Sequence, residues 1–500
     1  MSFRRRLSTA LLTSFLTCSC IFAEDTVPSS VPGPTAKTTA PELTLQQCID
    51  RALKKNFTLE VERYNPLIAK DAIDVAKGGY DPVVTASGFH GRSTTGASGG
   101  QSSAGTTSSE LRAGISQKLY TGTTLTASSQ LDRSKDNPAI YSLNPAYNAD
   151  LTLEVRQSLL SGFGTAVNKA ALNRAKIGLN VANLDFKTQA LDVIQNTEDA
   201  YYNLAFAREQ LNVRNLSLEL AQRLYDEAKT RRDTGVSTNL DVLQGEVGVA
   251  NARRNVLLAE QQTKDSQDAL LALIGQFELD TDVGTVHFKD EEEPLPVFAS
   301  SYQMAKQNQP DYLASQAVID QLKLDVVVAK DATKPDLSVG GAVGLNGNRG
   351  NANDAFGDAF DRRNNSWQVD FSFSYPWGQV SEKARYRQSI STLSREQMRL
   401  RQIEQSIEVN VRSAVRSVET NHESVKIAAL ASDLSQKQYE LEKARFDAGL
   451  STSYRVLQAQ NDLDTARVNE LEAKVSLHTA VAALHRIEGS SLQHYGVSLP

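Results

Sequence analysis

Glu419 and His422 have the spacing of a metal-binding pair, because residues three apart share one face of a helix. A di-iron site needs two such pairs and further glutamates, whereas this sequence holds six histidines and no second pair. It also lacks the HExxH pattern of zinc proteases and the CxxC pattern of thiol oxidoreductases. We therefore expect Glu419 and His422 on a solvated helix face. The sequence predicts no enzyme activity, no metal site and no cofactor.

The chain is instead organised around one stretch that occurs twice, beginning at Tyr225 and again at Tyr439. Gly235 and Gly449 mark the two copies and stand 214 residues apart, and the same offset aligns a Ser-Thr pair and a Val-Leu-Gln run in each copy. An internal repeat of this length indicates a duplicated domain half and not a solenoid, whose repeats are far shorter. The sequence therefore predicts one architecture built from two halves.

Composition and the repeat divide the chain into five segments. These are a signal peptide over 1–23, a flexible leader over 24–41, a first structural repeat over 42–290, a second over 291–489, and a C-terminal tail over 490–500 that we expect to be poorly ordered. The net charge of −6 gives no reason to expect a nucleic acid as partner. After the N-terminus no apolar run is long enough for a transmembrane helix.

The N-terminus has the features of a secretory signal. Arginines precede an apolar stretch over 7–22, and we expect cleavage after Ala23. The alternative is lipoprotein processing with acylation of Cys18 or Cys20, although neither cysteine has a good preceding triplet. Cleavage after Ala23 would leave Cys48 as the only cysteine, which excludes an internal disulfide.

Side-chain patterning along the chain alternates between the periods of strands and of helices. Alternation of polar and apolar residues predicts strands over 83–91, 110–120, 124–132, 149–159, 335–345 and 367–377. Helical patterns and long stretches without proline predict helices from residue 43, over 67–77, 165–232, 238–274, 302–330, 381–446 and 451–487. Residues 91–108 are of low complexity and predict a solvated loop.

The segment over 367–377 alternates most strictly. Its aromatic and aliphatic residues fall on one face, its polar residues on the other, and the only two tryptophans of the chain stand at its ends. About nine to eleven tilted residues cross a bilayer as a strand, and aromatic side chains collect at both interfaces. We therefore assign Trp367, Tyr375 and Trp377 to membrane interfaces, although a soluble sandwich strand would show the same alternation.

The number of strands predicts that several chains share one barrel. Roughly four to six such strands per chain cannot close a membrane barrel, which needs at least eight, and lipid does not tolerate an open sheet edge. The helices carry narrow apolar stripes in a heavily polar sequence, which suits long coiled-coil packing. A helix of roughly 65 residues spans about 100 Å. A tube of such helices, continuous with a shared barrel, would be a conduit.

At the repeated stretch the sequence resembles the TolC family of outer-membrane efflux channels. The resemblance covers residues 43–489 and rests on the paired Gly-(Val/Leu)-Ser-Thr turns, the Val-Leu-Gln segments after them, and Leu-Leu-Ser-Gly-Phe-Gly over 159–164. It implies a mainly α protein with membrane β-strands, whose duplicated half-repeats give a trimeric shared β-barrel, of twelve strands, continuous with a long periplasmic α-helical coiled-coil tunnel. The extra strand pair over 110–132 leaves open whether each subunit has four or six strands.

The resemblance also implies a function. The chain would be the outer-membrane channel of a tripartite efflux or type I secretion system, located in the cell outer membrane with a large periplasmic portion. As a homotrimer it would passively conduct drugs, small molecules or proteins from an inner-membrane pump, to which a periplasmic adaptor joins it. Two alternatives are a periplasmic coiled-coil adaptor, which has one hairpin where this chain has two, and a self-contained porin, which would not need helices of about 100 Å.

In this family the glycine-containing turn lies at the periplasmic tip and docks the helical hairpin of the adaptor. The docking positions implied for this chain are Thr234, Gly235, Val236 and Ser237 in the first copy, and Ala448, Gly449, Leu450 and Ser451 in the second. Turn chemistry alone also explains the pattern, because a reversal between antiparallel helices needs a left-handed residue followed by a Ser or Thr cap.

Some entrances in this family carry a ring of aspartates on the second returning helix. The matching positions here are Arg455 and Gln458, so that ring is absent, and Asp241 is the first-copy counterpart of Arg455. Our hypothesis is that Asp241 and Arg455 form ion pairs that hold a periplasmic gate closed. An exposed pair contributes about 0–1 kcal/mol, so a gate would need several pairs or burial. Two solvated charges are the alternative.

Overall fold

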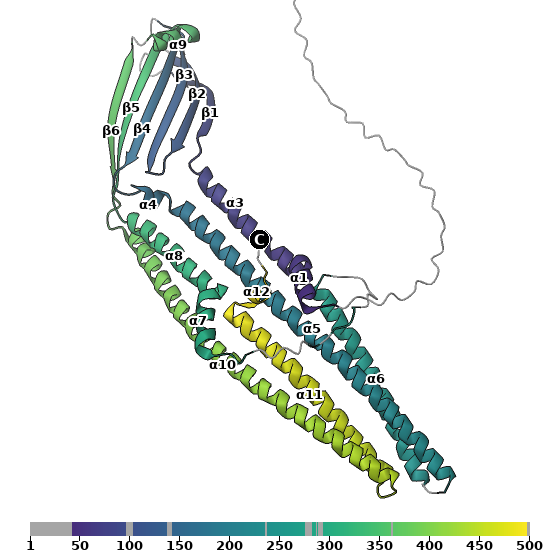
Figure 1. The fold of residues 1–500 in the computed structure, drawn as a ribbon. Helices are drawn as coiled ribbons and strands as arrows, with labels where there is room; N and C mark the ends of the chain where they lie inside the picture. The colour runs from purple at the N-terminus through teal and green to yellow at the C-terminus, as the bar shows by residue number, and fades with distance from the viewer. Residues whose placement is uncertain are drawn as a thin grey trace, which may run out of the picture.

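The computed structural model describes residues 43–96, 104–137, 143–235, 238–275, 283–286, 288, 294–361 and 364–497. The expected signal peptide and nearly all of the expected leader lie outside these residues. The molecule is elongated, with a β-sheet at one end and the tips of two helical hairpins at the other (Figure 1). Among the described helices, none has the length and apolar character that a bilayer crossing requires.

All the strands of the described chain belong to one antiparallel sheet of six, ordered as in the sequence. They are β1 (Val83–Thr95), β2 (Ala104–Lys118), β3 (Thr123–Asn137), β4 (Ala146–Ser158), β5 (Asp336–Arg349) and β6 (Asn365–Ser374). Each predicted strand is present, so the open strand count is six per chain. A trimer of this chain therefore does not fit the twelve strands that the resemblance implied. The loop predicted over 91–108 is wrong at both ends, where β1 and β2 continue.

Helices form the rest of the described chain, which is mainly α. In the first half they are α1 (Leu45–Lys55), α2 (Phe57–Glu62), α3 (Tyr64–Gly78), α4 (Thr165–Asn168), α5 (Ala170–Asp233) and α6 (Asn239–Leu273). In the second half they are α7 (Phe298–Asn308), α8 (Pro310–Asp331), α9 (Ala352–Phe360), α10 (Val380–Asp447), α11 (Ser453–Glu488) and α12 (Ser491–His494). With 64 and 68 residues, α5 and α10 are roughly 95 to 100 Å long.

The sequence duplication is visible in the connections. Helix α3 leads into β1 as α8 leads into β5, and α5 follows β4 as α10 follows β6. The hairpin β2–β3 has no counterpart in the second half and is an insertion in the first. The single helix predicted over 302–330 is wrong, because it divides at Pro310, where Gln309 is extended at φ −68° and ψ 118°. Proline has no N–H to continue a helix and disfavours the α conformation in the residue before it.

Two short helices lie where the sequence predicted loop or disorder. Helix α9 begins at Asn351, whose side chain accepts a hydrogen bond of 2.9 Å from the N–H of Asp354. Helix α12 packs against the largest core cluster through Leu492, which is buried. The prediction of a poorly ordered tail is therefore wrong for residues 490–497, and the last three residues lie outside the described chain.

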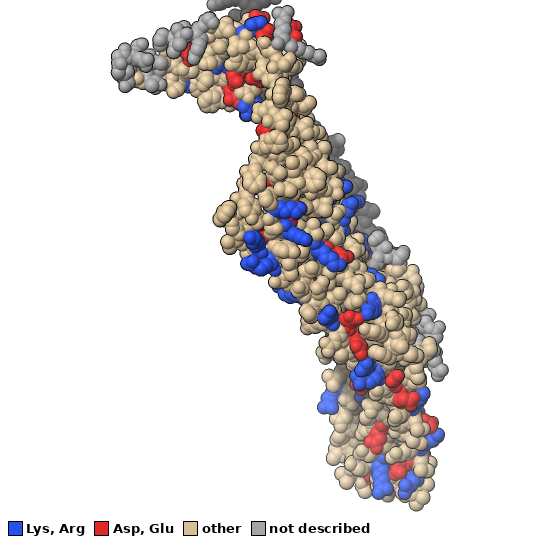
Figure 2. Space-filling model, turned by 90° about the vertical axis from the view of Figure 1, so that its left-hand side faces the viewer, with Lys and Arg blue, Asp and Glu red and all other residues tan. Residues whose placement is uncertain are grey.

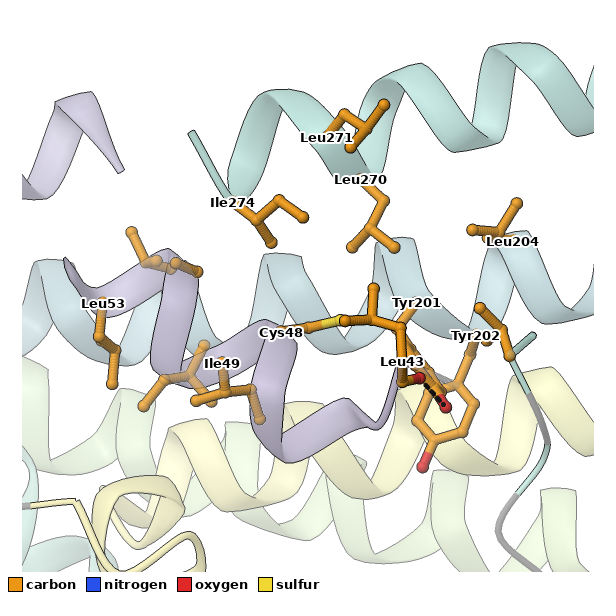
Figure 3. Packing of buried hydrophobic residues seen from close by; sticks show 14 of the residues in the cluster. Leu43, Cys48, Ile49, Leu53, Tyr201, Tyr202, Leu204, Leu270, Leu271 and Ile274 are labelled. Carbon is orange, nitrogen blue, oxygen red and sulfur yellow. Dashed lines mark hydrogen bonds between the residues drawn. The ribbon is translucent and has the colours of Figure 1, made fainter. Parts of the chain in front are cut away.

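The largest core cluster lies midway along the molecule, where α1 packs against α5 and α6 (Figure 3). Ile49, Leu204 and Leu270 are fully buried in it. The hydroxyl of Tyr201 donates a hydrogen bond of 3.4 Å to the carbonyl of Leu43 and so fixes the start of the described chain on this core. Cys48 is completely buried in the same cluster, and this burial raises the pKa of its thiol from 9.0 to about 12.

Burial and the raised pKa together predict that Cys48 is unreactive. The thiolate is the nucleophile, and a shift of this size lowers its population about a thousandfold at neutral pH. A maleimide should leave Cys48 unlabelled in the native protein, as followed by mass spectrometry, and label it after denaturation. The control is Asp50→Cys in a Cys48→Ala background, an exposed position on the same helix that should react at once. Native labelling of Cys48 at the rate of the control would contradict the packing.

Candidate functional site

Two helix reversals lie together at the end of the molecule far from the sheet (Figure 1). Gly235 ends α5 with φ +79° and Gly449 ends α10 with φ +73°, a left-handed conformation that favours glycine. In the second reversal the N–H of Leu450 donates to the carbonyl of Arg445 at 2.8 Å, which is the Schellman pattern. Thr234 and Ala448 precede the glycines in the predicted positions. Val236 and Ser237 lie outside the described residues.

The two copies differ in how the returning helix is capped. In the first copy, Thr238 Oγ1 accepts from the N–H of Asp241 at 3.3 Å, and Asp241 Oδ2 accepts from the N–H of Thr238 at 2.9 Å. This reciprocal pair is a capping box. In the second copy Thr452 has no side-chain cap bond, since Arg455 stands at the position of Asp241 and cannot accept one. The difference between Asp241 and Arg455 is therefore first a difference in capping.

The structure places the predicted gate residues near one another without joining them directly. Asp241 Oδ1 accepts a hydrogen bond of 3.1 Å from Ser453 Oγ and so links the two hairpins. Among the ion pairs of the described residues, none joins Asp241 to Arg455 within the chain. The amide of Gln458 donates to Asp462 at 3.3 Å. The gate role of Asp241, Arg455 and Gln458 stays a prediction, as does adaptor docking at the tips.

Arg231 joins the two tips, a role that sequence reasoning missed. Its Nη1 donates to the carbonyl of Phe446 at 3.1 Å, and its guanidinium lies 4.2 Å from the centre of the Phe446 ring. A carboxylate oxygen of Asp447 is 3.7 Å away. Beneath this contact a small core of α5, α10 and α11 includes Leu224, Phe446 and Val456. The repeat aligns Arg231 with Arg445, so alignment alone could not show which copy bridges to the other.

At the other end of the molecule, strand register separates the sheet into two faces. One row of partners crosses all six strands through Val84, Ile115, Ala127, Leu153, Val343 and Trp367. We call this side the apolar face and the other side the polar face. Large side chains of the apolar face are open to the surroundings, with Trp367 77% and Phe371 74% exposed. A soluble protein rarely exposes such a continuous apolar surface, so this face marks a contact with lipid or another chain.

The predicted interface aromatics are divided between the strand and the segment after it. Trp367 lies in β6 on the apolar face. Tyr375 and Trp377 come after the end of β6 at Ser374, and Trp377 is 97% exposed. The predicted strand end at residue 377 is therefore three residues too late. The membrane-interface role of these aromatics stays a prediction.

Charged residues sort between the two faces. Every Asp and Glu within the six described strands lies on the polar face, namely Glu110, Asp132, Asp136, Asp150, Glu154, Asp336 and Asp370. The polar face also holds Arg112, Lys118 and Arg156, whereas the apolar face holds Arg92, Arg133, Lys135 and Arg349. Arg156 bridges three strands, at 2.9 Å from both Glu154 and Asp370.

Sequence reasoning missed this sorting, although the alternation within each strand carries the signal. Arg133 and Lys135 continue the apolar positions of Leu125 and Leu131, but the strand predicted over 124–132 ended just before them. A face that is apolar along its length and cationic beyond one end is the feature that the shorter strand concealed.

His422 does not lie on a solvated helix face as expected, whereas Glu419 does. The side chain of His422 is 27% exposed and lines a cavity of about 670 Å³ beside α7, α10 and α11. Its ring nitrogen Nδ1 is 3.7 Å from Glu423 and not bonded to Glu419. Within the part of the chain that the structure describes, no group of three His, Cys, Asp or Glu residues is placed to hold a metal ion.

Known proteins share this sequence pattern and fold. The model of the outer membrane efflux protein family matches residues 144–276 and 301–490, more than half of the chain. The pyoverdine export outer membrane protein OpmQ of Pseudomonas aeruginosa is 25% identical over 367 residues, which cover 70% of this chain and 72% of OpmQ. OpmQ of Pseudomonas putida is 28% identical over 172 residues, 34% of this chain and 36% of that protein. The solved outer-membrane channel OprN has the same fold, with a TM-score of 0.69, 18% identity and coverage of 90% of each chain.

The contact of Arg231 with Phe446 predicts that Arg231→Ala loosens the tips. Loss of a charged hydrogen bond and a cation–π contact costs about 1–2 kcal/mol, which corresponds to roughly tenfold faster opening of the local structure. Hydrogen exchange of the amides over 445–450 should accelerate by that factor. The matched control is Arg232→Ala, because the guanidinium of Arg232 bonds to the neighbouring Asp233 at 2.6 Å. Equal exchange in both variants would show that Arg231 does not join the hairpins.

Proposed function

The chain belongs to the outer membrane efflux protein family, and we propose that three copies close into one outer-membrane channel that passively conducts cargo out of the cell. The family places the chain in the outer membrane of a Gram-negative envelope, with a periplasmic portion. The observation that carries the proposal is the six-stranded sheet, which is too small to close alone and has one exposed apolar face.

The two edges of the sheet require partners. β1 and β6 each pair with one described strand and leave the other edge open. An open edge within lipid leaves backbone N–H and C=O groups without hydrogen bonds, and a membrane barrel needs at least eight strands. Pairing of β1 of one copy with β6 of the next satisfies both edges. Three copies of a six-stranded sheet would close an eighteen-stranded barrel.

The helices below the two edge strands support the same closure. No residue of α3, which leads into β1, is buried, and Ile68 and Val75 are 64% and 78% exposed. At the opposite flank Val380 and Met398 of α10 are 78% and 61% exposed. Figure 2 looks at the flank that carries β6 and α10, where the surface just below the sheet is almost free of charged side chains. A neighbouring copy would cover both apolar flanks at once.

The length and the tips of the helices suit a tunnel that meets other proteins in the periplasm. Helices of 64 and 68 residues carry the hairpin tips far from the sheet. We assign docking of a periplasmic adaptor, and through it an inner-membrane pump, to the reversals at Gly235 and Gly449. Leu450 is 74% exposed at the second reversal and offers an apolar contact there. The arrangement serves a tripartite efflux or type I secretion system, with small molecules or proteins as cargo.

The two alternative functions fit less well. A periplasmic adaptor has no use for an exposed apolar sheet face, and this chain has two hairpins. A self-contained porin would need a barrel closed by one chain, whereas the described strands form a single open sheet of six.

Cysteines at the two edges test the closure. Val84 begins β1 and Phe373 ends β6, both on the apolar face at the end of the sheet nearest the helices. Within one chain they are five strand spacings apart, or at least about 24 Å. In a Cys48→Ala background, Val84→Cys with Phe373→Cys and a bismaleimide of about 10 Å, roughly two strand spacings, should give covalent dimers and trimers on a denaturing gel.

Each single-cysteine variant is the control and should remain monomeric, because three-fold symmetry keeps identical positions apart. Only monomers from the double variant, or a ladder that continues beyond trimers, would refute a closed ring of three copies.

The polar face predicts a cation-preferring channel. Seven carboxylates and three cations leave a net charge of −4 per copy on the face that would line the barrel. In a planar bilayer with a potassium chloride gradient, the reversal potential should report cation preference, and Asp132→Asn with Asp150→Asn should move it toward zero. Asp433→Asn, an exposed carboxylate on α10, removes the same kind of charge from the helices and should leave the potential unchanged. An anion-preferring channel would contradict the assignment of the polar face to the lumen.

A further inference from the structure

Three cations on the apolar face of the sheet stand apart from all carboxylates. None of the ion pairs among the described residues includes Arg92, Arg133 or Lys135. Arg133 is held by Tyr147, to whose hydroxyl its Nε donates at 3.1 Å and over whose ring its guanidinium lies at 5.9 Å. The chain segments over 97–103 and 138–142, which connect these strands, contain no Asp or Glu. We call Arg92, Arg133 and Lys135 the cationic rim.

The cationic rim lies about one bilayer core above the helix side of the sheet. Arg92 is nine residues beyond the start of β1 at Val83, and Arg133 is ten beyond the start of β3 at Thr123. With a rise of roughly 3.4 Å per residue and a strand tilt of about 40°, both reach a height of about 23–26 Å. The apolar band of a membrane barrel is about 25 Å tall. The rim therefore lies where lipid headgroups begin on the far side of the membrane.

The three side chains also lie close enough together to share one anion. Arg92 and Lys135 occupy the same register row, with Thr107 of β2 between them. Two strand spacings separate them, roughly 10 Å, and Arg133 is two residues from Lys135, roughly 7 Å along β3. Long arginine and lysine side chains span such distances, and guanidinium groups match the geometry of phosphate oxygens.

The fourth cation of the apolar face shows what neutralisation looks like here. Arg349 donates to Asp358 of α9 at 2.6 Å, and Asp358 is buried. Helix α9 packs on the apolar face itself, since a side chain at Gly347 would overlap the carbonyl of Ala355. Phe360 at the end of α9 is 65% exposed beside this site. The chain thus supplies a carboxylate for Arg349 and none for the cationic rim.

We propose that the cationic rim binds the phosphate groups of anionic lipids in the outer leaflet of the outer membrane. The proposal rests on the proposed function, which puts the apolar face of the sheet in lipid. Cations next to an apolar band meet headgroups and not water alone, and each such cation strengthens binding to an anionic surface about fivefold. The acyl chains of the same lipid would cover the exposed apolar rows below the rim, which gives one ligand both of the contacts that the face offers.

Lipid binding to the purified protein tests the proposal. Native mass spectrometry would titrate the full-length assembly in detergent with diphosphoryl lipid A and with its fully dephosphorylated form. The wild-type protein should retain the phosphorylated lipid. Arg92→Gln with Arg133→Gln and Lys135→Gln should weaken that binding roughly a hundredfold. The matched control, Arg112→Gln with Lys118→Gln and Arg156→Gln, removes three positive charges from the polar face and should bind as the wild type does.

The possible outcomes separate lipid recognition from other readings. Equal binding by the rim variant, or equal binding of the dephosphorylated lipid, would overturn the proposal. Displacement of the lipid by millimolar inorganic phosphate would show a site for a free anion and would also overturn it. Conductance of the rim variant in a phospholipid bilayer should match that of the wild type. Failure of the proposed function would appear separately, as a wild-type protein that forms no conducting trimer.

Discussion

Unpaired backbone groups at a sheet edge cost several kcal/mol each in lipid, and this cost determines how the chain must assemble. Here the edges belong to β1 and β6, which are the strands attached to α3 and α10. Pairing β1 of one copy with β6 of the next therefore also brings α3 of one copy against α10 of its neighbour. The exposed apolar residues of both helices, such as Val75 and Val380, lie on the flanks that this pairing would bury. The requirement at the membrane thus extends to the helices below it.

The duplication lets one chain provide two similar hairpins, and the small differences between them give each a distinct part. Asp241 caps its helix and accepts a hydrogen bond from Ser453 of the other hairpin. Arg231 reaches the carbonyl of Phe446 across the same boundary. Both bridges run from the first copy to the second, so the hairpins of one chain form a joined pair. The contacts between chains need not repeat these bonds, because Arg455 replaces Asp241 in the second copy.

The sequence predicted those features that period and turn chemistry determine, and it failed where tertiary contacts decide. All six strands and both glycine reversals were predicted, because alternation and left-handed turns are local properties. The break at Pro310 was also local and could have been predicted from proline alone. Helix α9 and the tail through Leu492 could not, since short helices are stabilised by the surface on which they pack. The contact of Arg231 was equally hidden, because its repeat counterpart Arg445 has the same side chain.

The inserted hairpin β2–β3 changes the membrane end without changing the helices. Removal of the hairpin would leave β1 and β4 as the two first-half strands, in the same relation to α3 and α5 that β5 and β6 have to α8 and α10. The insertion adds two strands per copy, and barrel diameter grows roughly in proportion to strand number. It also supplies Glu110, Asp132 and Asp136 on the polar face and two of the three cations of the rim. One insertion therefore widens the barrel, adds negative charge to its lumen and adds positive charge to its outer surface, while the periplasmic helices keep their common arrangement.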